Sequence, residues 1–237
     1  MAYINPIAPP ALQPPAMHIP DGFVSAPVAA IGYVAAGVAL AIAVRQTNRN
    51  LQEKAVPLMG VMAAFIFAAQ MMNFPVAGGT SGHMLGAALA TMLLGPWAAM
   101  IVIACVVAVQ ALVFQDGGLA ALGPNVWNMA VVGVVTSYAV YRALKLIGNG
   151  QPMWDYMARF GAAWASVQFA ALFATLELVI SDTSPLNVAL PAMMGVHALI
   201  GIGEGLITVA AIAFVAATRR DLLHSPAGKE FTVETHK

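Results

Sequence analysis

Long apolar runs with few or no charged residues recur along the chain, and each is long enough, or nearly so, to cross a hydrocarbon layer of about 30 Å as a helix. They lie at 24–44, 57–74, 96–114, 126–147, 160–180 and 188–217. Apolar residues make up 60% of the 237 residues and charged residues only 8%, against about 25% charged in an ordinary soluble domain. The sequence therefore predicts an all-α integral membrane protein.

A further apolar run, Thr80 to Leu94, is either a short seventh span or the front half of one long helix with the run that follows it. Charge separates the two alternatives. With seven spans and an outside N-terminus, all ten Lys and Arg residues fall on the cytoplasmic side, in line with the positive-inside tendency. The Gly95-Pro96 pair supports the split, because proline disfavours helix in the residue before it. We expect a seven-helix transmembrane bundle in the cell membrane, with the N-terminus outside and the C-terminus cytoplasmic.

Two histidines, His18 and His83, lie on the predicted outer face, in segments without Lys or Arg and next to glycine and proline. Non-helical backbone of this kind is tolerated at membrane depth only where protein or a cavity buries it. Two imidazoles that meet in one buried pocket would form a metal site. The alternative is an interfacial histidine and a histidine at the start of a helix. Asp21 either attracts cations or caps the first helix, and capping is favoured slightly.

His197 and Glu204 lie seven residues apart in the last apolar run and therefore on one face of a helix. An ionisable pair within a membrane span is a functional hypothesis by default. The alternatives are hydrogen bonding within the bundle, which is favoured, a proton relay, and the acid–base pair of an intramembrane metalloenzyme. The chain has neither an HExxH motif nor a P-loop, and its net charge of zero gives no indication of a nucleic-acid partner.

Four blocks of sequence, spread from about Met17 to Thr218, carry a resemblance to a known family. They are MHIPDGF, NFPVAGGTSGHMLGAALATMLLGPW, QALVFQDGGLAALGPNVWNM and HALIGIGEGLIT. The chain resembles CbiM and NikM, the cobalt and nickel substrate-capture proteins of energy-coupling factor transporters. The resemblance implies a non-catalytic transport subunit without a cofactor, which holds Co²⁺ or Ni²⁺ as substrate. Its expected partners are a transmembrane coupling protein, two cytoplasmic ATPase subunits and a small accessory membrane protein.

The resemblance also implies the metal ligands: the free amine of Met17, the backbone nitrogen and imidazole of His18, and the imidazole of His83. The chemistry agrees, because an amine, the adjacent amide and its imidazole close consecutive small chelate rings. Four nitrogens in a plane suit Ni²⁺, with Cu²⁺ as a competitor, and the choice between cobalt and nickel stays open. Nearby polar residues are candidates for orienting the imidazoles or for interhelical hydrogen bonds. These residues are Gln70, Asn73, Ser81, Asn125 and Asn128.

Sixteen residues, MAYINPIAPPALQPPA, precede Met17 and would block its amine. They lack the features of a signal peptide, and their proline content predicts an extended, disordered arm. We expect that translation starts at Met17 or that the arm is trimmed. The chain then divides into this extension, 1–16, a metal-capture domain, 17–218, and a cytoplasmic tail, 219–237. The alternative functions are a capture protein for a vitamin and, less favoured, a membrane metalloenzyme that uses His197 and Glu204.

Overall fold

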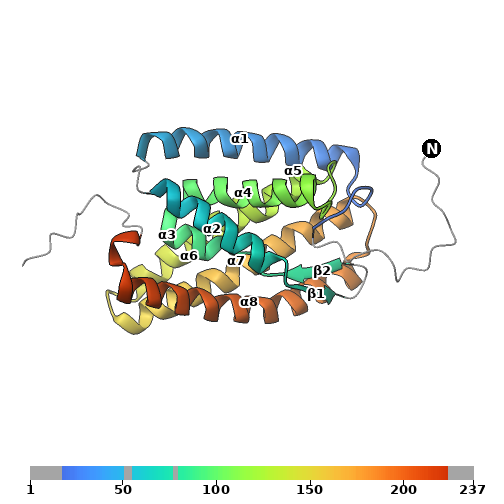
Figure 1. Ribbon diagram of the computed structural model, residues 1–237. Coiled ribbons are helices and arrows are strands. Elements are labelled where there is room, and N and C mark those ends of the chain that lie inside the picture. The colour runs from blue at the N-terminus through green and yellow to red at the C-terminus, as the bar shows by residue number, and fades with distance from the viewer. Residues whose placement is uncertain (1–17, 51–54, 77–79, 224–237) are drawn as a thin grey trace, which may run out of the picture.

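The computed structural model describes residues 18–50, 55–76 and 80–223, and shows a helical bundle with one β-hairpin (Figure 1). The elements in chain order are α1 (Ala26–Asn50), α2 (Ala55–Gln70), β1 (Asn73–Val76), β2 (Thr80–His83), α3 (Ala87–Leu94), α4 (Pro96–Val113), α5 (Leu122–Val126), a π-helical segment (Trp127–Val132), α6 (Gly133–Ile147), α7 (Pro152–Ile180), α8 (Leu186–Thr218) and a 3₁₀ turn (Arg220–Leu222). Because α5, the π-helical segment and α6 run on without a break, these elements make seven helical segments, as expected.

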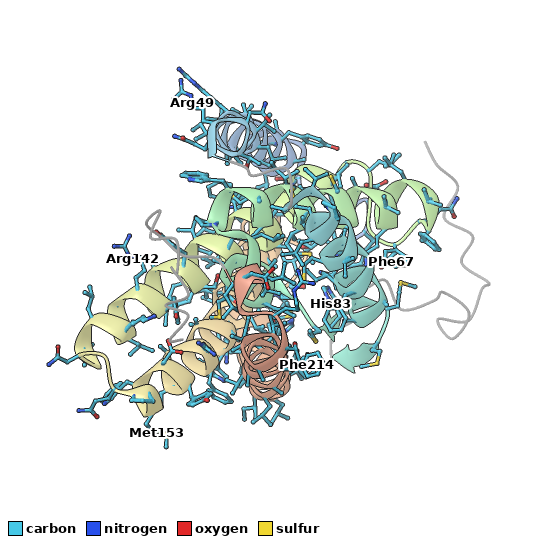
Figure 2. The ribbon with its side chains drawn as sticks, turned by 60° about the vertical axis from the view of Figure 1, so that its left-hand side comes forward. Arg49, Phe67, His83, Arg142, Met153 and Phe214 are labelled. Carbon is cyan, nitrogen blue, oxygen red and sulfur yellow. The ribbon has the colours of Figure 1, made fainter. Side chains whose placement is uncertain are left out.

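Five of these segments are long and apolar enough to cross a membrane. They are α1, α4, the run from α5 to α6, α7 and α8, while α2 is a shorter apolar helix. Their outward faces carry large apolar side chains such as Val34, Leu199 and Phe214, which are 68%, 71% and 69% exposed. Figure 2 shows Phe214 and Met153 pointing away from the bundle and His83 inside it. The protein is a multi-pass membrane protein, as its composition predicted.

The segment from Thr80 to Leu94 differs from the expectation. Thr80–His83 is a strand that pairs antiparallel with Asn73–Val76, and α3 begins only at Ala87. The expectation that the run is helical from Thr80 onward, with His83 near the start of the helix, is therefore wrong. Apolar content alone does not separate a short buried strand from a helix. The predicted break at Gly95-Pro96 is confirmed, since Gly95 has a φ of 78° and Pro96 occupies the first turn of α4.

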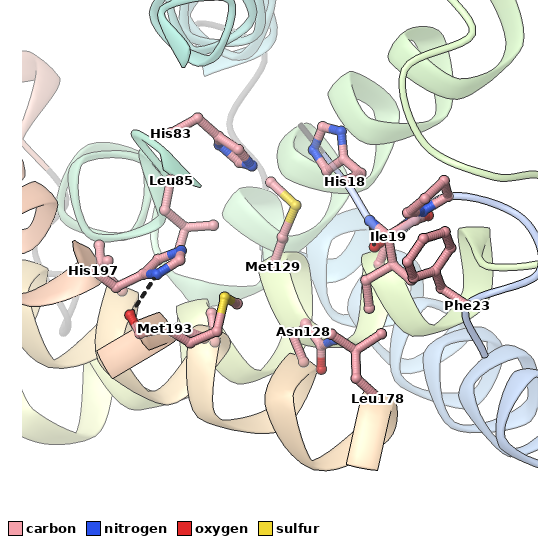
Figure 3. A pocket seen from close by; sticks show the side chains of 16 residues that line it. His18, Ile19, Phe23, His83, Leu85, Asn128, Met129, Leu178, Met193 and His197 are labelled. Carbon is pink, nitrogen blue, oxygen red and sulfur yellow. Dashed lines mark hydrogen bonds between the residues drawn. The ribbon is translucent and has the colours of Figure 1, made fainter. Parts of the chain in front are cut away.

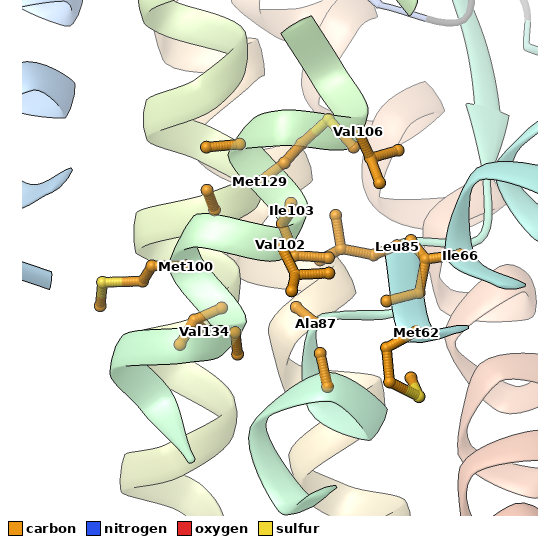
Figure 4. Close-up of a cluster of buried hydrophobic side chains, with 14 of the residues drawn as sticks. Met62, Ile66, Leu85, Ala87, Met100, Val102, Ile103, Val106, Met129 and Val134 are labelled. Carbon is orange, nitrogen blue, oxygen red and sulfur yellow. The ribbon is translucent and has the colours of Figure 1, made fainter. Parts of the chain in front are cut away.

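The core forms around α3, of whose eight residues seven are buried. Small side chains let neighbouring elements approach closely: a Cβ on Gly133 would lie 2.8 Å from Leu85 Cδ2 and 3.2 Å from Ala87 Cβ. Figure 4 shows Leu85 and Ala87 packed among Ile66, Ile103 and other side chains of α2, α4 and α6. This packing fixes the short segment that leads from His83 into α3.

The two ends of the bundle differ in their residues. One end, here called the pocket end, carries residues 18–25, the hairpin, the loop between α4 and α5, and the turn between α7 and α8 (Figure 1). The opposite end, here called the basic end, carries the last turns of α1, α6 and α8, the 3₁₀ turn that follows α8 and the start of α7. All Lys and Arg residues that the structure describes belong to the segments of the basic end.

Candidate metal site

The main chain beside His18 is fixed by hydrogen bonds to the loop and helix that follow α4. The Ile19 N–H donates to Asn125 Oδ1 at 3.1 Å, and Asn125 Nδ2 donates to the Ile19 carbonyl at 3.0 Å. That carbonyl also accepts the Gly118 N–H at 3.0 Å. Asn125 was a candidate for orienting an imidazole or for an interhelical hydrogen bond; in the structure it holds the backbone next to His18, and the His18 side chain is buried.

The loop between α4 and α5 is shaped to receive this segment. Gly117 has a φ of 96°, a conformation that favours glycine, and a Cβ there would lie 2.7 Å from the Cβ of His18. Asp21 accepts the N–H groups of Leu119 and Ala120 at 3.1 and 2.7 Å. The prediction that Asp21 caps the first helix is therefore wrong, because its carboxylate binds the loop before α5.

His83 is positioned by the segment that follows it. The carboxylate of Glu204 accepts the Leu85 N–H at 2.6 Å and the Gly86 N–H at 2.9 Å. Gln70 Nε2 donates to the Leu85 carbonyl at 2.9 Å. These backbone groups would otherwise be buried without partners, which costs free energy. Glu204 and Gln70 thus hold the turn between β2 and α3, and His83 with it.

The two histidines of the sequence prediction meet at the pocket end. Their ring centroids are 4.8 Å apart, with 53° between the ring planes, and both rings line a cavity of about 90 Å³. Figure 3 shows the rings pointing toward one another, with the Met129 thioether beside them. His83 Nδ1 lies 2.9 Å from the Met84 carbonyl oxygen, so the proton belongs on Nδ1 and the Nε2 lone pair remains available.

The electrostatics of the two rings suit a cation. Burial, and secondly the neighbouring His18, lower the pKa of His83 to about 3. His83 is therefore a neutral imidazole near neutral pH, which is the form that binds metals. Among the described residues, neither ring nitrogen of His18 has a hydrogen-bond partner. The His18 and His83 imidazoles together would supply half of a four-nitrogen site.

Asp116 is a residue of the site that sequence reasoning missed. Its Oδ2 lies 3.4 Å from His18 Nδ1, and the residue is 9% exposed. The one sequence signal was the position of an acid within QDGG, directly after the apolar run 96–114 and on the same predicted face as His18. The contact itself depends on the path of the loop, which the sequence pattern does not give.

His197 and Asn128 line the same cavity without contacting the histidine pair through any hydrogen bond in the described structure. His197 Nδ1 lies 2.8 Å from the Met193 carbonyl oxygen. Asn128, within the π-helical segment, donates from Nδ2 to Glu177 Oε2 at 2.6 Å. The structure does not pair His197 with Glu204, because both carboxylate oxygens of Glu204 accept backbone N–H groups.

Three of the predicted site residues are not placed. Met17 lies outside the described residues, as does the extension 1–16, and the side chains of Asn73 and Ser81 are not described. Within the described ranges, no group of three His, Cys, Asp or Glu side chains is arranged to hold one metal ion. The described side chains therefore supply two imidazoles, and a four-nitrogen site requires main-chain or terminal nitrogens as well.

The comparison with known families matches residues 18–222 to CbiM, described as "Cobalt uptake substrate-specific transmembrane region". The chain belongs to the CbiM family. The match begins at His18 and covers the hairpin, all the helices and the histidine pair. The family resemblance read from the four sequence blocks is thereby confirmed, and with it the class of cobalt and nickel transport proteins.

Relatives and solved structures support the membership of this chain in the CbiM family. A putative fused nickel transport protein NikMN of Archaeoglobus fulgidus is 43% identical over 89% of this chain and 69% of its own length. A cobalt transport protein CbiM of Sorangium cellulosum is 31% identical over 87% of this chain and 94% of its own length. A crystal structure of a truncated transition metal transporter matches with a TM-score of 0.75 and 33% identity, over 85% of this chain and 99% of that one.

Proposed function

We propose that this CbiM-family chain is the substrate-capture component of an energy-coupling factor transporter for Ni²⁺ or Co²⁺. The observation that carries the proposal is the approach of His18 and His83, 4.8 Å apart between ring centroids, from segments that are far apart in the sequence. The names of the relatives support both metals, since some are called nickel and others cobalt transport proteins.

The ion is held by four nitrogens in this proposal. The amine of Met17, the amide nitrogen of His18 and the His18 imidazole close two chelate rings, and the His83 imidazole takes the fourth position. Such a set suits Ni²⁺ and also admits Cu²⁺, so discrimination against copper rests on site geometry and metal supply. The proposal requires a free amine, and therefore a working N-terminus at Met17.

The alternative functions find less support in the site. A vitamin pocket is larger, with several converging hydrogen-bonding groups, whereas this cavity is about 90 Å³ and lined mainly by apolar side chains. A metalloenzyme that uses His197 and Glu204 needs a free carboxylate, and the Glu204 oxygens accept the Leu85 and Gly86 N–H groups. Transport without catalysis on this chain is the better supported function.

The proposal extends to orientation and assembly. The pocket end faces outward, where the substrate arrives, and the basic end faces the cytoplasm, in line with the positive-inside tendency. A coupling membrane protein, two ATPase subunits and a small accessory membrane protein complete the transporter. A shallow apolar groove along α1 supports a contact with another membrane protein, and it is lined by Ala35, Ala39 and other apolar residues, with Trp127 and Val131.

Metal analysis of the purified protein tests the proposal. Protein that begins at Met17 should carry close to one Ni²⁺ or Co²⁺, and His83→Ala should lose it while remaining folded. The change removes a ligand and the ring's own hydrogen bond to the Met84 carbonyl, and it leaves the backbone pairing of β2 with β1 in place. His224→Ala, in the predicted tail, is the matched control and should bind as the parent does. Protein that begins at Met1 should bind at least tenfold more weakly, about 1.4 kcal/mol. A His83→Ala variant with undiminished metal content would place the site elsewhere.

A further inference from the structure

Asp116 lies where the charge of a captured ion would be felt most strongly. Its Oδ2 is 3.4 Å from Nδ1 of His18, the nitrogen through which His18 closes a chelate ring with its own amide. The Asp116 charge also acts on the second histidine, where it raises the pKa of His83 against the larger effect of burial. No other acidic side chain in the described ranges lies within 4.0 Å of a nitrogen of His18 or His83.

An ion captured in this position needs its charge balanced by the protein. The site is walled by apolar side chains, including Leu85, Met129 and Val167, and the segments around it carry no Lys or Arg. A net charge held away from water costs free energy unless a partner of opposite sign lies beside it. A divalent cation brings two positive charges, and the His18 amide supplies one negative charge when its proton is released to solvent on metal binding. One positive charge is left.

We propose that Asp116 is the counter-charge of the captured ion, so that the divalent metal, the deprotonated amide and one carboxylate form a neutral complex inside the protein. Asp116 acts beside the four nitrogens and is not one of the ligands. This role rests on the proposed function, since it presumes that the four-nitrogen site is filled by a divalent cation. It makes Asp116 a residue that favours divalent over monovalent ions.

A hydrogen bond and the conformation of the next residue fix the position of Asp116. Its backbone N–H donates to the Gln110 carbonyl at the end of α4, at 3.0 Å. The next residue, Gly117, has a φ of 96° and lets the loop pass against His18, where a Cβ would be 2.7 Å from the His18 Cβ. The path of the loop and the position of His18 are thus fixed together, so the Asp116 carboxylate stays beside the His18 imidazole.

Nickel titration of Asp116→Asn, in protein that begins at Met17, tests this role. The amide has nearly the shape of the carboxylate and lacks its charge, so we expect nickel affinity to fall tenfold or more, about 1.4 kcal/mol per tenfold. The visible ligand-field spectrum at saturation should stay that of the parent, because the four nitrogens remain. The matched control is Asp182→Asn, since Asp182 is exposed at the pocket end and has a φ of 57°, which asparagine tolerates.

The outcomes separate the possibilities. Asp182→Asn should change affinity less than twofold, because a charge in water is screened. Parent-like affinity in Asp116→Asn overturns the counter-charge role. A changed spectrum also overturns it, since the carboxylate would then be a ligand or a support for the ligands. If the parent itself binds neither nickel nor cobalt, the proposed function fails first, and that result is distinct from both.

Discussion

The two ends of the bundle use polar side chains in different ways. At the pocket end and just inside it, Asn125, Asp21 and Glu204 hydrogen-bond to backbone groups of distant segments. At the basic end, charged side chains pair with one another: Asp155 contacts Arg159 within α7 and Lys145 of α6, the latter at 3.4 Å. The first arrangement fixes the path of the chain, whereas the second balances charge near the surface.

The difference follows from what each end has to do. A metal site needs its donors held closely in position by surrounding groups, so irregular segments there are tied to the bundle by side chains that satisfy their backbone. Exposed ion pairs, in contrast, contribute little to stability and tolerate change. Substitutions at the pocket end should therefore disturb metal binding, and comparable substitutions at the basic end should not.

The largest expected effect is in a labelling experiment that tests which end faces outward, because labelling at each end should be all or none. Cys105 is the one cysteine, so a Cys105→Ala background allows single cysteines to be placed at either end. In intact cells, a membrane-impermeant maleimide should label Asn187→Cys, in the first turn of α8, and should not label Gln151→Cys, just before α7.

Permeabilised cells supply the control, since both cysteines should then react. Both residues are exposed in the structure, and burial would not explain a difference between them. The reverse labelling pattern would show that the basic end faces outward, against the positive-inside tendency, and labelling of both sites in intact cells would contradict a fixed orientation.

Two glycine substitutions, with a smaller expected effect, distinguish backbone strain from damage to the metal site. Gly117 at the pocket end and Gly150 at the basic end have φ values of 96° and 82°. A Cβ at Gly150 meets nothing within 4 Å, whereas one at Gly117 meets His18 at 2.7 Å. Alanine in a left-handed conformation costs about 1–2 kcal/mol, so Gly117→Ala and Gly150→Ala should both lower the free energy of unfolding.

Nickel affinity should respond at one end only. Gly117→Ala should weaken binding tenfold or more, because the new methyl group displaces His18, and Gly150→Ala should bind as the parent does. Isothermal titration with nickel and thermal melting in detergent measure the two quantities separately. Equal losses of affinity in both variants would show that binding follows overall stability rather than the shape of the loop around His18.

The sequence predicted most of the fold because long apolar runs have few alternatives in a membrane. The seven helical segments and the Gly95-Pro96 break were predicted and are confirmed. The hairpin was missed, and Thr80–His83 was assigned to a helix. Its backbone is paired by β1, and the residues that follow use the Glu204 carboxylate. Glu204 lies 119 residues from Leu85 in the sequence, and a partner so distant leaves no local signal.

The site was predicted in part, through the family resemblance and the chemistry of two histidines. That His18 and His83 lie together was expected. Asp116 was not considered, and Asn125 turned out to bind the Ile19 backbone. His197 and Glu204 do share a helix, yet His197 lines the cavity while Glu204 holds the turn after β2. The spacing of residues along a helix shows which face a side chain lies on, but it does not show which residue that side chain contacts.

The smallest expected effect is at the basic end. Lys145 is 55% exposed at its side chain and lies 3.4 Å from Asp155. Lys145→Ala should change the free energy of unfolding by less than about 1 kcal/mol, with nickel affinity unchanged, since Asp155 keeps its contacts with Arg159 and the Tyr141 hydroxyl. Asp155→Ala should cost more, because Arg159, only 14% exposed at its side chain, loses its partner. A loss of nickel binding in either variant would show that the two ends are coupled.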